Sequence, residues 1–182
     1  MHEQSQINAI KEDAGMLSIL QDIKGDVYVR LITEACKRCD KFSLIRTNYT
    51  QSYYKRATFS SKPIRQYRIK SKAVNSWPNG GPGEEYIKMN PDYPYKSIMD
   101  IYRVCDETRD FLISQGDMFN WCPPDLPEDL CFYRGEDCWM FCTAHEEICM
   151  INTNDRCDRL LLMDMGLDFI QTDELMDYKL KL

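Results

Sequence analysis

The residues best able to do chemistry lie in one twelve-residue stretch, Cys138–Cys149, which reads CWMFCTAHEEIC. Its three cysteines and its histidine could supply the four thiolate and imidazole ligands of a structural zinc site. The spacing disfavours such a site, because residues four apart on an extended strand lie about 13 Å apart at ~3.3 Å per residue. Free cysteine is also among the most commonly buried residue types. We therefore predict that these cysteines pack in the core, and we assign no metal ligand and no cofactor.

His145 and Glu146, with Glu128 upstream, are the candidate catalytic residues if the chain is an enzyme. A carboxylate beside a histidine can orient it as a general base, which would make the chain hydrolase-like. The sequence pairs them with no nucleophile motif and no Gly-rich phosphate loop. HEEIC resembles half of a helical zinc-protease motif, but its surroundings favour a strand. We therefore favour a structural His145, held by hydrogen bonds at a strand end.

A second group of candidates lies within residues 46–72, which contain eight basic and no acidic residues. Arginines interleaved with tyrosines suit single-stranded nucleic acid, since cations meet phosphates and rings stack on bases. They also suit a protein interface, or a solvated edge strand protected by lysines. The whole chain is acidic, so a protein partner is favoured over nucleic acid. The candidate binding residues are Arg46, Arg56, Arg65, Arg68, Tyr53, Tyr54 and Tyr67.

Charge is distributed unevenly along the 182 residues, whose net charge is −6. Residues 100–182 hold nineteen acidic and seven basic residues, a balance of −12, so the molecule can present two oppositely charged faces. No apolar run reaches the ~18 residues of a membrane span, and the N-terminal residues do not resemble a signal peptide. The nine cysteines are odd in number, which favours reduced thiols. We expect a cytoplasmic protein with no membrane partner.

Helices are expected wherever apolar residues recur at helical spacing. Residues 26–39 give the clearest case, since their apolar positions form one continuous stripe. Helices are also predicted at about 107–116 and 154–165, with a short one at 16–25 that Gly25 ends and a weaker one at 172–182.

Strands are expected at 41–49, 63–72 and 96–105, where β-branched and aromatic residues gather. Two apolar runs joined by the polar turn RGED form a hairpin over 130–142, and EEICMI can add a third strand. The order predicts a single α+β domain over 1–182, with a mainly antiparallel sheet and a C-terminal meander packed by helices. Residues 1–15 are expected to be poorly ordered, and 77–95 to form an exposed loop.

Residues 121–151 resemble a stretch shared by small uncharacterised bacterial proteins, some of which carry the label "stage III sporulation protein AH". That stretch runs as tryptophan, proline, Leu-Pro-Glu-Asp-Leu-Cys-Phe, a turn, tryptophan and His-Glu. The resemblance implies a bacterial cytoplasmic origin, directs attention to residues 126–146 and brings no activity. A membrane-anchored sporulation component would need an apolar span, which this sequence lacks. The matching residues are Trp121, Pro124, Leu126, Pro127, Glu128, Asp129, Leu130, Cys131, Phe132, Trp139, His145 and Glu146.

The sequence thus favours a small, acidic, non-catalytic interaction protein that binds another macromolecule, such as an immunity or antitoxin-like inhibitor or a regulator. Its acidic half would meet a basic partner, and complementary charge would speed their encounter. The first alternative is the hydrolase-like enzyme built on His145, Glu146 and Glu128. The second is a zinc-stabilised nucleic-acid binder that uses the basic segment 46–72.

Overall fold

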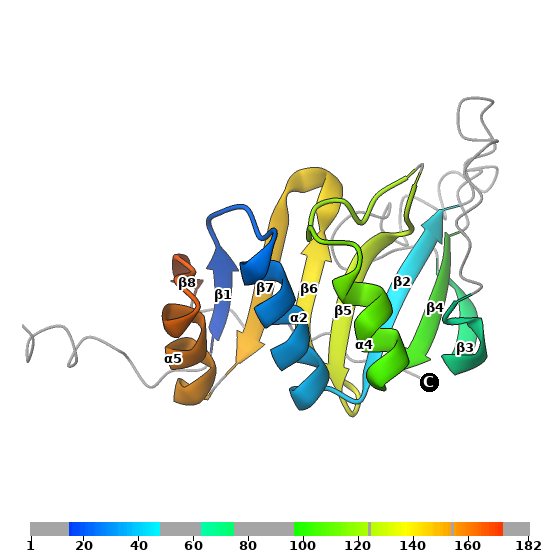
Figure 1. The fold of residues 1–182 in the computed structure, drawn as a ribbon, viewed down its shortest axis with the longest axis horizontal. Coiled ribbons are helices and arrows are strands. Elements are labelled where there is room, and N and C mark those ends of the chain that lie inside the picture. Colours follow the sequence, from blue (N-terminus) through cyan, green and yellow to red (C-terminus); the bar gives the residue numbers. More distant parts are fainter. Residues whose placement is uncertain (1–14, 48–62, 75–96, 124, 154, 173–182) are drawn as a thin grey trace, which may run out of the picture.

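The computed structural model describes residues 15–47, 63–74, 97–123, 125–153 and 155–172. They form an α+β fold around one antiparallel sheet, in the order β3-β4-β2-β5-β6-β7-β1-β8 (Figure 1). This architecture confirms the predicted fold class. The strands are β1 (Gly15–Ile19), β2 (Lys41–Thr47), β3 (Arg68–Val74), β4 (Ser97–Arg103), β5 (Glu128–Arg134), β6 (Asp137–Thr143), β7 (Ile148–Thr153) and β8 (Phe169–Thr172).

The helices of the described residues lie on one face of this sheet (Figure 1). They are α2 (Asp26–Arg38), α4 (Asp106–Ile113) and α5 (Arg156–Asp164), with short 3-10 turns η1 (Arg65–Tyr67) and η2 (Ala144–Glu146). The predicted stripe of the first helix is confirmed, because Tyr28, Leu31, Ile32 and Ala35 are buried. None of these helices is long and apolar enough to cross a lipid bilayer.

The helix predicted at residues 16–25 is wrong, because this segment begins with strand β1. Leu17 and Ile19 are buried in alternation with half-buried neighbours, and β1 pairs with β7 on one side and β8 on the other. Five residues are too few for the period of two to stand out from helical spacing, so long-range pairing decides the structure. Strand β8 was not predicted. The expected helix at 172–182 falls almost wholly outside the described residues, as do the segments 1–14 and 77–95.

Two clusters of buried residues lie on opposite faces of the sheet. The first contains the apolar faces of the helices and includes Trp139, Met140 and Cys142; the second contains strand residues, including Cys138 and Phe141. The β5–β6 register shifts where Phe132 pairs with Met140 and Tyr133 with Cys138, which leaves Trp139 as the extra residue of a bulge. The bulge therefore turns consecutive residues Trp139 and Met140 toward the helices.

Candidate functional site

The first site lies where β5 begins and β6 ends, at the end of the sheet that is uppermost in Figure 1. Glu128 and Asp129 open β5, while η2 places His145 and Glu146 directly after β6. Asp129 has φ 58° and Glu147 has φ 55°, and these are the two non-glycine residues of positive φ in the described part of the chain. Such backbone costs about 1–3 kcal/mol per residue and clusters at functional sites. The strain therefore singles out this end of the sheet.

The carboxyl group of Asp129 is at the centre of this site, and the residue is only 4% exposed. The backbone N–H of Ala144 donates to it, but its Oδ1 has no hydrogen-bond partner among the described residues. Burial raises the pKa of Asp129 to about 7; the nearby carboxylates of Glu128 and Glu146 act in the same direction, and the Ala144 N–H opposes them. A buried carboxyl group that titrates near neutrality is a feature of functional sites.

His145, the general base of the enzyme alternative, lies at the surface rather than in the buried part of the site. Its side chain is 51% exposed, and Nε2 is 3.8 Å from Oε1 of Glu146. The expected strand-end position thus becomes an exposed 3-10 turn. Glu128 and Glu146, the other two candidate catalytic residues, both lie close enough to Asp129 to raise its pKa. The structure therefore brings two of the three candidates together around a residue outside the predicted set.

Asp129 was missed as a site residue, although the sequence contains a signal for it. Glu128 and Asp129 directly precede Leu130, Cys131 and the rest of a strand that is buried on both faces. Consecutive strand residues point to opposite faces, so a pair of carboxylates that opens a fully buried strand must place one of them inside.

Further carboxylates gather around this site. Burial raises the pKa of the Cys122 thiol, and Glu128 and Asp125 add to that rise. Burial also raises the pKa of Cys142, with Asp117 among the neighbouring groups that contribute. The carboxylates therefore share one end of the sheet, and we call this group the acidic rim. Its members are Asp117, Asp125, Glu128, Asp129 and Glu146.

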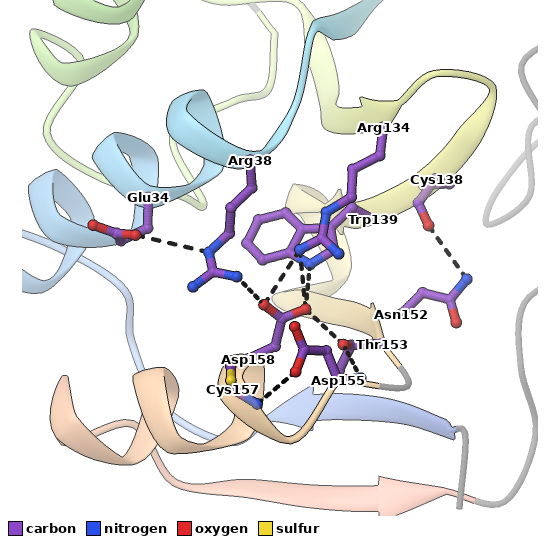
Figure 2. A network of polar contacts seen from close by, with 10 residues as sticks. All are labelled: Glu34, Arg38, Arg134, Cys138, Trp139, Asn152, Thr153, Asp155, Cys157 and Asp158. Carbon is purple, nitrogen blue, oxygen red and sulfur yellow. Dashed lines mark hydrogen bonds and ion pairs between the residues drawn. The ribbon is translucent and has the colours of Figure 1, made fainter.

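A separate polar network surrounds Asp158 in helix α5 (Figure 2). This carboxylate is 1% exposed and accepts from Arg38 at 2.5 Å and from Arg134 at 3.0 Å. It also accepts from Nε1 of Trp139 at 2.9 Å and from Oγ1 of Thr153 at 2.6 Å. The donors come from α2, β5, β6 and β7, so one buried charge joins two helices to the central strands. Both oxygens of Asp158 accept hydrogen bonds from these donors, so we assign this residue a role in stabilising the fold.

The basic segment is brought together only in part. Arg46 and Arg68 both contact the buried carboxylate of Asp100. Arg65 is exposed in η1, and Tyr67 packs against the cluster on the helix side. The remaining predicted binding residues, Tyr53, Tyr54 and Arg56, lie outside the described residues.

Cys138, Cys142 and Cys149 are buried as predicted, and all nine cysteines are free thiols. Cys142 and Cys149 are buried opposite each other in the β6–β7 ladder, on the helix side of the sheet. Cys138 is buried on the other side, and His145 is exposed, so these four residues do not converge on one point. Burial raises the pKa of Cys149 to about 12, which keeps its thiol protonated at neutral pH. Among the described residues, no group of three or more His, Cys, Asp or Glu side chains could hold a metal ion.

Comparison of the chain with protein-family models, with curated proteins and with solved structures finds no match. Its function must therefore be argued from the site itself.

Proposed function

We propose that the chain is a small, non-catalytic interaction protein of the bacterial cytoplasm that binds a basic segment of a partner protein through the acidic rim. Inhibitors of the immunity or antitoxin type, and small regulators, are the class that we favour. The observation that carries the proposal is the carboxyl group of Asp129. Asp129 is buried and has a positive φ, one of its oxygens has no hydrogen-bond partner among the described residues, and Glu128 and Glu146 lie close enough to raise its pKa.

A cation supplied by a partner would relieve the repulsion within this group. Glu128 and Glu146 both disfavour the charged form of Asp129 in the free protein. A positive charge within ~4–6 Å of a carboxyl group lowers its pKa by about 1–3. A lysine or arginine held by Glu128 and Glu146 therefore makes ionisation of Asp129 favourable. Binding then releases a proton near neutral pH, and the strained site gains a compensating interaction.

The charge of the wider molecule supports the same partner. Residues 100–182, which carry the acidic rim, have a balance of −12 between basic and acidic residues. An extended negative field accelerates the encounter with a basic protein and disfavours nucleic acid.

The proposal is tested by the affinity of the purified chain for fluorescent decalysine, measured by anisotropy at low salt. We expect the Glu128→Gln/Glu146→Gln double variant to bind about tenfold more weakly, as for a loss of ~1.4 kcal/mol shared by two charge contacts. Glu136→Gln is the matched control, because Glu136 is exposed in the turn at the opposite end of the same hairpin. An equal loss of affinity in the control would mean that decalysine binding depends only on the net charge of the protein, and the proposal would be wrong.

An enzyme remains the second candidate, because Asp129 also has a feature of catalytic acids. A carboxyl group with a raised pKa beside an ionised carboxylate is the arrangement of many general acids. On that alternative, His145 would act with Glu146 as the base. The interaction proposal predicts instead that His145→Gln leaves decalysine binding within about twofold, since its half-exposed side chain carries little of the rim's charge. If the chain is instead a hydrolase with His145 as its general base, the same variant should lower that activity by about 100-fold or more.

A further inference from the structure

Asp100 in β4 holds two arginines at one place on the same face of the sheet as Tyr102, which is the face that the helices cover. Arg46 extends from β2 and donates through Nε at 2.5 Å and through Nη2 at 3.1 Å. Arg68 extends from β3, and its Nη1 lies 3.5 Å from Oδ1 of Asp100. Ser71, directly opposite Asp100 in the β3–β4 ladder, donates its hydroxyl to the same oxygen.

The charges in this group do not cancel. Two guanidinium groups share one carboxylate, which leaves a net charge of +1 on these three side chains. Asp100 is only 1% exposed, whereas the Arg46 side chain is 43% exposed and Arg68 is 28% exposed. A guanidinium has five N–H donors, and Asp100 takes two from Arg46 and one from Arg68. Both arginines therefore keep N–H donors that have no partner among the described residues, and both side chains are partly exposed.

The two arginines are also held in position before any ligand arrives. Arg46 meets Asp100 through two parallel N–H···O bonds, the geometry that fixes a guanidinium plane most firmly. Asp100 is itself fixed by Ser71 and by its place in a strand paired on both sides. Side chains that are already ordered lose less conformational entropy when they bind, so a fixed arginine pair favours a ligand that contacts both of its members.

We propose that Arg46 and Arg68 form a binding site for a phosphate group, and that Asp100 is the residue that positions them. A phosphate offers acceptor oxygens in several directions, so it can meet guanidinium groups that arrive from two different strands. A carboxylate presents both oxygens in one plane and suits a single guanidinium better. The chain from Pro63 to Val74 contains no acidic residue that would repel the anion. This site adjoins the acidic rim, because Ile45, next to Arg46, pairs with Glu128 across β2 and β5, but its proposed ligand does not depend on the basic partner proposed for the rim.

The test follows the Nε–Hε NMR signals of the arginines in the full chain as inorganic phosphate replaces chloride at constant ionic strength. We expect the signals of Arg46 and Arg68 to shift together along one saturating curve. Arg109 is the internal control, because it is an arginine in α4 that pairs with Asp106 and Asp110. Shifts that fail to saturate, or that are equally large at Arg109, would overturn the proposal.

Variants separate a built site from general charge. Arg68→Gln should weaken phosphate binding by about tenfold, as expected for one lost charged hydrogen bond, while Arg109→Gln should leave it unchanged. Arg68→Lys keeps the charge beside Asp100 and thus the fold, yet loses the planar fork, so we expect it also to bind more weakly than wild type. Phosphate binding that is as strong in both Arg68 variants as in wild type would contradict the assignment.

The positioning role of Asp100 has its own measurement. Asp100→Asn should speed the exchange of the Arg46 Nε–H with solvent and weaken phosphate binding, because the guanidinium is no longer held. Tighter binding in this variant would show that net charge alone governs the site. The same titration with glycerol 2-phosphate then shows whether the site prefers a phosphate ester or free phosphate. Binding equal to that of inorganic phosphate indicates a site for phosphate esters, and weaker binding indicates one for the free anion.

Discussion

The carboxyl group of Asp129 links the stability of the protein to pH in an unusual direction. Its pKa is about 7 in the folded protein, against an ordinary value of 3.8. Between these two values the folded state keeps a proton that the unfolded chain has released, so stability falls as pH rises from about 4 to 7. At about 1.4 kcal/mol per pKa unit, the loss is at most of the order of 4 kcal/mol.

Asp129→Asn should remove that pH dependence. Asparagine keeps the shape of the side chain and tolerates positive φ, but it carries no charge that burial can penalise. We expect the variant to melt at a higher temperature than wild type at about pH 8, and at nearly the same temperature at about pH 4. Thermal unfolding followed by circular dichroism at both values measures the difference. A variant whose stability changes with pH as steeply as wild type would show that Asp129 does not titrate in this range.

The environment of Asp129 also marks the limit of what the sequence predicts at the scale of residues. Glu128 and Glu146 were identified as candidates because of their types and spacing. The strand pattern indicates that one of the two carboxylates that open β5 is buried, but the neighbours of Asp129 come from η2, which follows β6 and brings the Ala144 N–H and Glu146 to the start of β5. Local sequence does not encode that contact, which arises from the antiparallel pairing of two strands.

At the scale of elements, helix α5 illustrates which features the sequence predicts. Its existence follows from the apolar spacing, and its start lies two residues after the predicted one. Asp155 caps it by accepting the Cys157 N–H at 2.8 Å, although Thr153, which directly precedes the predicted start, is also a residue type that caps helices. Thr153 instead donates to Asp158. Competing local hydrogen bonds decide between neighbouring polar residues, so helix existence was predictable and the identity of the cap was not.

The network around Asp158 should contribute much of the free energy that holds α5 against the sheet. Asp158→Ala removes the buried carboxylate that Arg38 and Arg134 share, and breaking a buried pair in this way costs about 3–5 kcal/mol. Asp164→Ala is the matched control, since Asp164 lies in the same helix and pairs with Arg30 in an exposed bridge. The control should cost at most about 1 kcal/mol. Chemical denaturation of both variants gives the two free energies of unfolding. Equal losses would mean that the network stabilises the fold no more than an exposed ion pair does.

For the whole molecule, the meander of β5, β6 and β7 was predictable because adjacent strands are joined by short turns. The positions of β2 and β1 were not, since β2 lies between β4 and β5, and β1 between β7 and β8. These pairings join segments far apart in the chain, and the local pattern of apolar residues does not specify which strands meet.

A continuous sheet with helices on one face predicts unfolding as one unit. Ile32 is fully buried in α2, so Ile32→Ala should lower the free energy of unfolding by about 2–5 kcal/mol in a single cooperative transition. Met163→Ala, at a position 57% exposed on α5, should change it by no more than about 0.5 kcal/mol. Two transitions in calorimetry, with only one sensitive to Ile32, would indicate two units in place of the single domain predicted.

The central claim, that the acidic rim binds a cationic partner around Asp129, is tested most directly by the side-chain carboxyl carbon shift of Asp129 in NMR. In the free protein we predict a titration midpoint near the pKa of about 7. Saturating decalysine should lower that midpoint by about one to three pH units, because a nearby cation favours the charged form. A midpoint near the ordinary value in the free protein, or one that decalysine leaves in place, would contradict the account.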